Sequence, residues 1–183
     1  MEVKTIPNKE LIIVSGPSRS GKSKWAENLL SDSENVVYIA TSVPNDDLEW
    51  LERINIHKER RPDHWKLIES PDNIQTSIGN LSLQERIIID SLGAYVARYL
   101  HKNNYEWEVI ATDFVNFLLN QKRYIIIVVE ETGWGVVPVT LEGNLFRDRL
   151  GLLSQALSKV STQKWLVIQG SAINLDKISI EIP

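Results

Sequence analysis

The chain has 183 residues, a length typical of one domain. Its 20 Lys and Arg against 24 Asp and Glu give a formal net charge of −4, so the chain as a whole has no electrostatic basis for binding nucleic acid or an anionic membrane. It has no cysteine, which excludes disulfides, iron–sulfur clusters, thiolate zinc sites and cysteine nucleophiles. The three histidines are His57, His64 and His101. The N-terminal segment MEVKTIPNKE lacks the order of a signal peptide, and the apolar runs are far shorter than the roughly 20 residues that span a bilayer, so we expect a cytoplasmic protein without a membrane span.

The first predicted strand, 11–15, and the first predicted helix, 22–30, flank the segment GPSRSGKS. This segment matches the pattern G-x-x-x-x-G-K-[ST], whose backbone N–H groups surround phosphate oxygens. In such a loop the lysine reaches the β- and γ-phosphates and the hydroxyl binds Mg²⁺. We therefore interpret the segment as a phosphate site with Lys22 as a catalytic residue and Ser23 as a metal ligand. An ordinary glycine turn is the alternative, and it leaves the Lys-Ser pair unexplained. The residues of the candidate loop are Gly16, Pro17, Ser18, Arg19, Ser20, Gly21, Lys22 and Ser23.

A strand over 36–40 and a helix over 46–61 are predicted next. In that helix Arg53, His57 and Arg61 would lie on one face, with Lys58 and Arg60 close by. This cationic cluster would attract phosphate groups and would favour the neutral, nucleophilic form of the imidazole. On the residues alone, a solvated basic face with a passive histidine is the more common case.

The segment WKLIE, 65–69, predicts a strand near an edge, and RIIID, 86–90, predicts a buried strand that ends in Asp90. A carboxylate at the C-terminal tip of a parallel strand faces the ligand crevice, so Asp90 is a candidate Mg²⁺ ligand. A solvated acid at a strand end is the alternative. Two helices are predicted within 95–119, with a break around 102–104.

A buried strand over 124–130 leads into EETGWGVVP, which predicts a tight loop around Gly133 and Gly135. Trp134 in this loop either forms a ligand wall or packs on the core. A helix over 140–160 and a strand over 164–169 follow. The strands lack polar alternation, which indicates burial on both faces. The alternation of strands and helices predicts one α/β domain over 1–183, with a mostly parallel sheet flanked by helices.

These segments, in this order, resemble the bifunctional adenosylcobinamide kinase/adenosylcobinamide-phosphate guanylyltransferase family of cobalamin biosynthesis. The resemblance covers residues 11–170 and implies a P-loop NTPase-type fold. The histidine segment is its most specific part, because phosphate loops are shared by very many enzymes. The matching segments are GPSRSGKSKWAE, VYIATS, RINIHKERRPDHWKLIE, IIIDSL, EETGWGVVP, FRDRLGLLSQALS and WLVIQG.

The resemblance implies two reactions. ATP or GTP, with Mg²⁺, phosphorylates the aminopropanol hydroxyl of adenosylcobinamide. A histidine, which falls on His57, then attacks the α-phosphorus of GTP, releases pyrophosphate and carries GMP to adenosylcobinamide phosphate, giving adenosylcobinamide-GDP. The resemblance also implies a homo-oligomer, by analogy a trimer, with sites near subunit boundaries. Nucleotide contacts carried over from the family fall on residues 16–23, Ala40, Thr41, Ser42, Lys58, Glu59, Arg60, Arg61, Glu69 and Asp90.

Four residues depart from the family pattern. Glu130 stands where asparagine is common, Asn144 where arginine is common, Ser154 where asparagine is usual and Gly93 where threonine is frequent. Two other functions stay open: a small-molecule kinase without guanylyl transfer, and a non-catalytic nucleotide-binding switch. Against the switch, the sequence has no glutamine just after a DxxG motif and no N-K-x-D motif.

Overall fold

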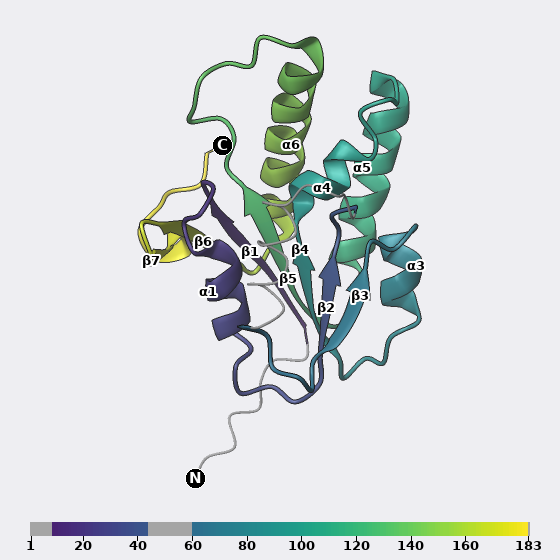
Figure 1. Ribbon diagram of the computed structural model, residues 1–183, viewed down its shortest axis with the longest axis vertical. Coiled ribbons are helices and arrows are strands. Elements are labelled where there is room, and N and C mark those ends of the chain that lie inside the picture. Colours follow the sequence, from purple (N-terminus) through teal and green to yellow (C-terminus); the bar gives the residue numbers. More distant parts are fainter. Residues whose placement is uncertain (1–8, 44–59, 183) are drawn as a thin grey trace.

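The computed structural model describes residues 9–43 and 60–182, and a seven-stranded sheet forms its centre (Figure 1). The strand order is β3-β2-β4-β5-β1-β6-β7. Neighbouring strands run parallel except β6 and β7, which are antiparallel. The predicted α/β class with a mostly parallel sheet is therefore confirmed. The strands are β1 Glu10–Gly16, β2 Val36–Ala40, β3 Lys66–Glu69, β4 Arg86–Asp90, β5 Tyr124–Glu130, β6 Gln163–Ile168 and β7 Ser171–Asn174.

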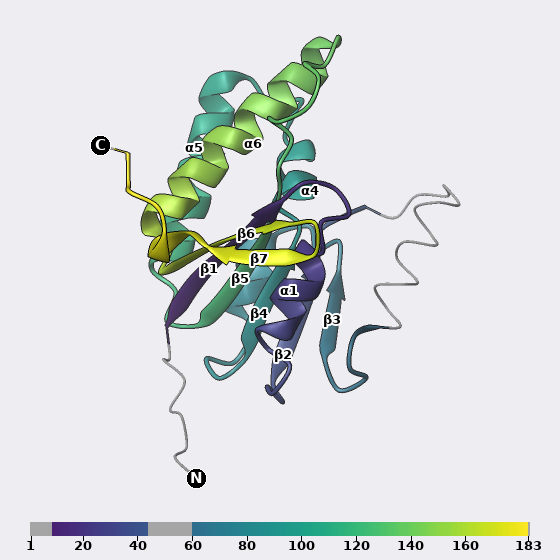
Figure 2. The same ribbon diagram turned by 90° about the vertical axis from the view of Figure 1, so that its left-hand side faces the viewer.

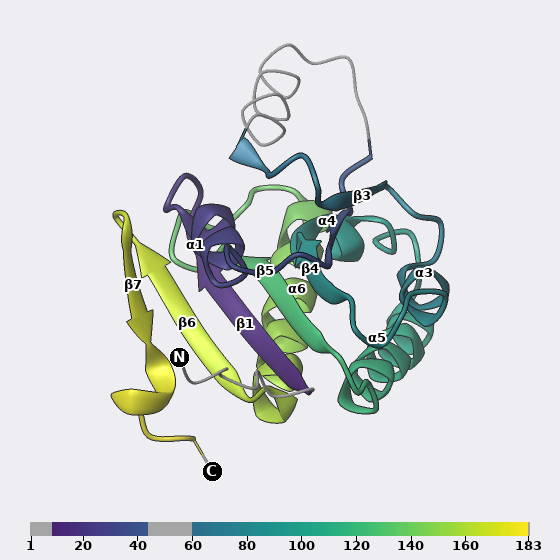
Figure 3. The same cartoon turned by 90° about the horizontal axis from the view of Figure 1, so that it is seen from below.

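Helices lie on both faces of the sheet (Figure 2 and Figure 3). Four of them, α3 to α6, pack on one face, and α1 packs on the opposite face. None of the helices within residues 9–43 and 60–182 has the length and apolar character needed to cross a membrane. The helices are α1 Lys22–Asn28, α3 Ile74–Gly79, α4 Leu92–Ala97, α5 Asn104–Leu119, α6 Leu141–Val160 and the short 3₁₀ helix η1 Leu175–Lys177.

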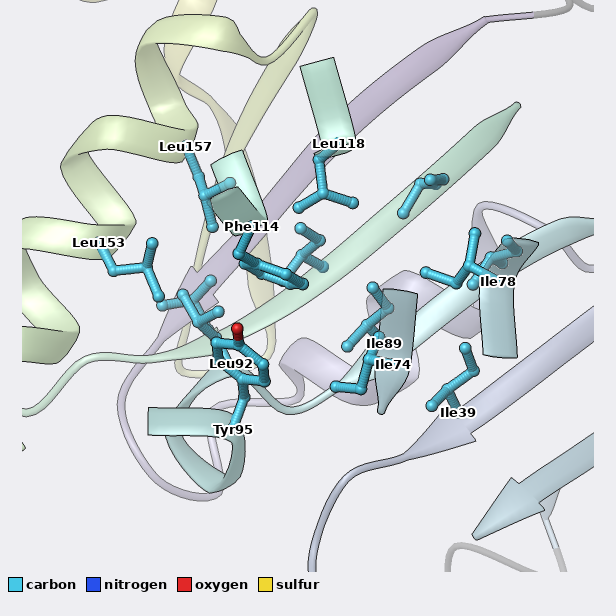
Figure 4. Close-up of a cluster of buried hydrophobic side chains, with 14 of the residues drawn as sticks. Ile39, Ile74, Ile78, Ile89, Leu92, Tyr95, Phe114, Leu118, Leu153 and Leu157 are labelled. Carbon is cyan, nitrogen blue, oxygen red and sulfur yellow. The ribbon is translucent and has the colours of Figure 1, made fainter. Parts of the chain in front are cut away.

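The larger hydrophobic core lies between the sheet and helices α3 to α6 (Figure 4). Leu11 of β1 points into this core, whereas the next residue, Ile12, points into the smaller core under α1. Burial of both faces explains why the strand sequences read as continuous apolar runs. Within the larger core the ring of Tyr95 on α4 stacks on Phe114 of α5, with ring centres 4.3 Å apart.

Several predicted boundaries have visible physical causes. The segment 65–69 is the edge strand β3, as predicted. The predicted break around 102–104 is also confirmed, because α5 begins with a capping box. The side chain of Asn103 accepts from the N–H of Glu106 at 3.0 Å, and the Glu106 carboxylate accepts from the N–H of Asn103 at 3.1 Å. The first of the two helices starts earlier than predicted, at Leu92.

The sequence did not predict α3 or β7. Helix α3 has six residues, and only Ile74 and Ile78 among them are buried, which is too short a pattern to show helical periodicity. Strand β7 returns antiparallel to β6 through a turn in which Gln169 and Gly170 have φ values of 50° and 75°. The predicted helix over 46–61 lies outside the described residues except for residues 60 and 61.

Candidate nucleotide-binding site

The carboxyl ends of the parallel strands place the predicted site residues along one edge of the sheet. From the outer strand inward, the strands end at Glu69, Ala40, Asp90, Glu130 and Gly16. Register confirms this alignment, since Ala40 pairs with both Glu69 and Asp90, and Gly16 pairs with Glu130. Ligands of open α/β sheets bind at this edge. The tertiary structure therefore brings together side chains that are far apart in the chain.

The predicted phosphate loop has the strand–loop–helix context that its motif requires. It leaves β1 at Gly16 and enters α1 at Lys22. Gly21, which precedes the helix, has a left-handed φ of 100°, and Arg19 has a φ of 59°. Lys22 is buried, and its ammonium group donates to the backbone oxygen of Pro17 at 3.4 Å, so the side chain folds back over the loop. A loop of this form surrounds an anion with N–H groups and a cation.

The β6–β7 hairpin supports the loop from outside. A Cβ atom at Gly16 would lie 2.2 Å from the backbone oxygen of Val167 in β6, so only glycine allows this approach. At the hairpin turn, the N–H of Gly170 donates to the backbone oxygen of Ser20 at 3.1 Å. The sequence did not assign Val167 or Gly170 to the site, although the segment WLVIQG contributed to the family resemblance.

Asp90 is held by a tyrosine that sequence reasoning missed. The hydroxyl of Tyr38 in β2 donates to Oδ2 of Asp90 at 2.5 Å. Burial raises the pKa of Tyr38 well above its usual value, so the phenol stays protonated and remains a donor. The guanidinium carbon of Arg61 lies 4.6 Å from the centre of the same ring. The signal in the sequence was a single phenol within the otherwise aliphatic run VVYIA.

Arg60 makes a bidentate ion pair with Glu27 of α1, and the contact between Arg60 Nη2 and Glu27 Oε1 is 2.7 Å. Burial raises the pKa of the Glu27 carboxyl, although the arginine opposes the shift. The hydrogen bond to Glu27 raises the pKa of Arg60. This pair attaches the chain after residue 59 to the helix that follows the phosphate loop.

Thr41 ties the end of β2 to the turn after β4. It is fully buried, and its hydroxyl donates to the backbone oxygen of Ser91 at 2.7 Å while accepting from the Ser91 N–H at 2.6 Å. Arg98 of the region after α4 donates to the backbone oxygen of Thr41 at 3.1 Å and to the hydroxyl of Ser70 at 2.7 Å. Arg98 and Ser70 were not predicted, because nothing local in the sequence distinguishes them from surface residues.

The family model for cobinamide kinase / cobinamide phosphate guanyltransferase matches residues 12–175. The chain belongs to this family. It is 31% identical over 180 residues to the bifunctional adenosylcobalamin biosynthesis protein CobU of Escherichia coli (strain K12), which covers 90% of this chain and 99% of that protein. It is 32% identical over 154 residues to the bifunctional adenosylcobalamin biosynthesis protein CobP of Pseudomonas aeruginosa, covering 80% of this chain and 86% of that protein. The family predicted from the sequence motifs is confirmed.

Solved structures share the fold of this family member at low sequence identity. A protein of Pyrococcus horikoshii OT3 aligns with a TM-score of 0.57 and 13% identity, covering 95% of this chain and 91% of that one. An ATPase from the type III secretion system of pathogenic bacteria aligns with a TM-score of 0.56 and 8% identity, covering 94% of this chain and 59% of that one. At these identities the likeness shows the fold alone, an α/β fold of the predicted class.

The structure describes most, but not all, of the residues that the resemblance to the cobinamide kinase / guanyltransferase family assigned to the nucleotide. Residues 16–23, 40–42 and 60–61, with Glu69 and Asp90, belong to the carboxyl edge of the sheet and the segments that follow it, whereas His57, Lys58 and Glu59 lie outside the described residues. Trp134 is 59% exposed, so the alternative that it packs on the core is wrong. Asn144 donates to the backbone oxygen of Pro138 at 2.7 Å and thereby braces the loop between β5 and α6.

Proposed function

We propose that this chain catalyses both reactions of its family on a corrinoid: phosphorylation of adenosylcobinamide with ATP or GTP, and transfer of GMP from GTP to the product. The observation that most supports this proposal is the family match over residues 12–175, which includes the candidate phosphate loop with its lysine folded over it. The loop lies at the same sheet edge as Asp90. Both reactions require a triphosphate held at such a site.

In the phosphorylation step, Lys22 and the loop N–H groups bind the β- and γ-phosphates. The oxygen of the substrate hydroxyl attacks the γ-phosphorus, its proton is released to solvent, and the bond to the oxygen of the leaving nucleoside diphosphate breaks. Ser23 and Asp90 would hold the metal through oxygen atoms, which suit a hard cation such as Mg²⁺. No group of three or more His, Asp or Glu side chains that could hold a metal occurs among residues 9–43 and 60–182. Mg²⁺ bound there would neutralise charge that develops on the phosphates.

In the guanylyl transfer, we propose His57 as the nucleophile. Its imidazole nitrogen attacks the α-phosphorus of GTP, the bond to pyrophosphate breaks, and a phosphoramidate forms. A phosphate oxygen of adenosylcobinamide phosphate then attacks the same phosphorus, and the nitrogen–phosphorus bond breaks. Lys58, Glu59, Arg60 and Arg61, next to the histidine in the chain, are proposed nucleotide contacts, as are Ala40, Thr41, Ser42 and Glu69. Arg60 forms an ion pair with Glu27 of α1. The guanidinium group of Arg61 lies over the ring of Tyr38, whose hydroxyl donates to Asp90.

We further propose a homo-oligomer, by family analogy a trimer, in the cytoplasm, with the corrinoid bound near residues 133–138. Apolar side chains of this region are exposed, among them Val136 at 94% and Val137 at 59%, which supports contact with an apolar ligand or another subunit. Sedimentation velocity with and without adenosylcobinamide tests the assembly.

The decisive experiment for the proposed function incubates the protein with GTP labelled at the α-phosphate. Denatured wild-type protein should retain label that is acid-labile and alkali-stable, and adenosylcobinamide phosphate should discharge it. His57→Ala should retain no label while keeping much of the phosphorylation activity. His64→Ala is the matched control, because His64 is exposed, and it should label normally. If the wild type phosphorylates adenosylcobinamide but retains no label, the chain is a kinase without guanylyl transfer. If it does neither and hydrolyses GTP slowly, the switch is the better interpretation.

A further inference from the structure

Glu130 ends β5, the strand between β1, which carries the phosphate loop, and β4, which carries Asp90. The half-buried carboxylate reaches the start of α4. Its Oε2 accepts from the N–H of Gly93 at 2.9 Å, and its Oε1 accepts from the hydroxyl of Ser91. Ser91 is the N-cap residue of α4, but its side chain makes no capping bond. Glu130 therefore satisfies a helix N–H that the cap residue leaves open.

Glycine is required at position 93 because a side chain there would collide with Glu130, and not because of its backbone conformation. It is buried, and its φ is outside the left-handed region. A Cβ atom at this position would lie 2.6 Å from Oε2 and 2.9 Å from Cδ of Glu130. Such distances are shorter than real Cβ contacts, so a side chain at position 93 and the present position of the Glu130 carboxylate exclude each other.

The contact bears on Asp90 because Ser91 is the next residue in the chain. The backbone of Ser91 is held by Thr41 through two hydrogen bonds of 2.7 and 2.6 Å, and its side chain is held by Glu130. The turn after Asp90 is thus fixed from β2 on one side and from β5 on the other. Asp90 is the residue that enters this turn, and its carboxylate accepts from Tyr38 of β2.

We propose that Glu130 is a positioning residue for Asp90 and that Gly93 is its matched partner. The inference rests on the proposed function, in which Asp90 serves the Mg²⁺–nucleotide complex. Glu130 acts through Ser91 and the start of α4, without contact to the reacting phosphate. Glu130 and Gly93 both stand out against the family pattern in the sequence, and their contact gives one physical reason for the two departures.

Two substitutions at Glu130 separate position from charge. In Glu130→Gln the amide oxygen can accept from the N–H of Gly93 and the amide nitrogen can donate to the Ser91 hydroxyl. Both hydrogen bonds therefore remain, and only the charge is removed. We expect its KM for Mg²⁺–ATP and its kcat in phosphorylation within about threefold of wild type. In Glu130→Ala both bonds are lost. We expect the Mg²⁺ concentration for half-maximal velocity to rise about tenfold, or about 1.4 kcal/mol, with a smaller change in kcat. Glu108→Ala, at an exposed position on α5, is the control.

The pairing is tested at Gly93. Gly93→Ala should raise the Mg²⁺ requirement about tenfold by displacing the carboxylate. Gly93→Ala combined with Glu130→Ala should be no worse than Glu130→Ala alone, because the collision is gone. Gly151→Ala is the matched glycine control, since a Cβ atom at this helical, exposed position meets nothing within 4 Å.

Three results would overturn the proposal: an unchanged Mg²⁺ requirement in Glu130→Ala, additive effects of the two alanine substitutions, or a Glu130→Gln enzyme as impaired as Glu130→Ala. The last result would mean that the charge itself acts on the substrate. If the wild type phosphorylates no adenosylcobinamide, the proposed function fails. In that case, calorimetric titration of the same variants with ATP at varied Mg²⁺ concentration still tests whether Glu130 and Gly93 act together. Urea unfolding of these variants measures their stability.

Discussion

Gly16→Ala tests the assignment of the phosphate loop most directly. The added Cβ atom would lie 2.2 Å from the backbone oxygen of Val167 and 2.8 Å from the hydroxyl oxygen of Ser20. Ordinary van der Waals contact begins at 3.4 Å, so relief of the first contact alone requires a shift of 3.4 minus 2.2, or about 1.2 Å. Because the contacted oxygen of Val167 belongs to the backbone of β6, rotation of a side chain cannot supply this shift. The end of β1 and the start of the loop must move.

The expected loss follows from the size of that shift. Overpacking of this kind costs about 1–3 kcal/mol of stability. A misplacement of about 1 Å in a positioning element can cost about 100-fold in catalytic rate, and we expect the Kd for Mg²⁺–GTP to rise by a similar factor, which corresponds to about 2.7 kcal/mol. Calorimetric titration measures the Kd, and urea unfolding of the same samples measures stability. The matched control is Gly79→Ala at the exposed end of α3, where a Cβ atom meets nothing within 4 Å.

Stability and affinity should both fall in Gly16→Ala and stay near wild type in Gly79→Ala. A folded Gly16→Ala protein with the wild-type Kd for Mg²⁺–GTP and Mg²⁺–ATP would refute the reasoning. It would show that the nucleotide does not depend on the close approach of Gly16 to β6.

Three further predictions concern single side chains around the same edge. Lys22→Ala should abolish both phosphorylation and histidine labelling in a folded protein, because one phosphate cradle serves both steps; activity assays on the purified variant check this, and retention of either activity contradicts a shared cradle. Tyr38→Phe removes the donor to Asp90 and should lower the free energy of unfolding by about 1.5–3 kcal/mol, the usual value for a hydrogen bond to a charged group, with a raised Mg²⁺ requirement; unchanged values for both would show that the carboxylate finds another partner. Burial raises the pKa of Glu27 above its ordinary value of 4.5, so the folded state holds this proton more tightly than the unfolded state, and the resulting stabilisation is present below pH 4.5 and is lost as pH rises through the folded pKa. The stability of the wild type relative to Glu27→Gln, measured by urea unfolding, should therefore decrease as pH rises above 4.5, and an increase would mean that attraction to Arg60 outweighs burial.

Elements whose signal is local were predicted well from the sequence. The strand and helix on either side of the candidate phosphate loop were expected from a contiguous motif between an apolar run and a helix, so their positions need no tertiary information. The buried strands show as continuous apolar runs because both faces of the sheet are covered. The short helix α3 and strand β7 gave no comparable pattern, since each has few buried residues and depends on neighbours distant in the chain.

The sequence by itself determined the family, and it made residues 16–23 the candidate phosphate loop and Asp90 a candidate metal ligand, because each rests on residue identity at short spacing. Only the tertiary structure decided which side chains support them. Tyr38 bonds Asp90 across 52 positions of the chain, and Glu130 bonds Gly93 across 37. Sheet order creates these contacts by placing β2 and β5 on either side of β4. No local pattern encodes that order, because strand neighbours are selected by the packing of the whole sheet against its helices.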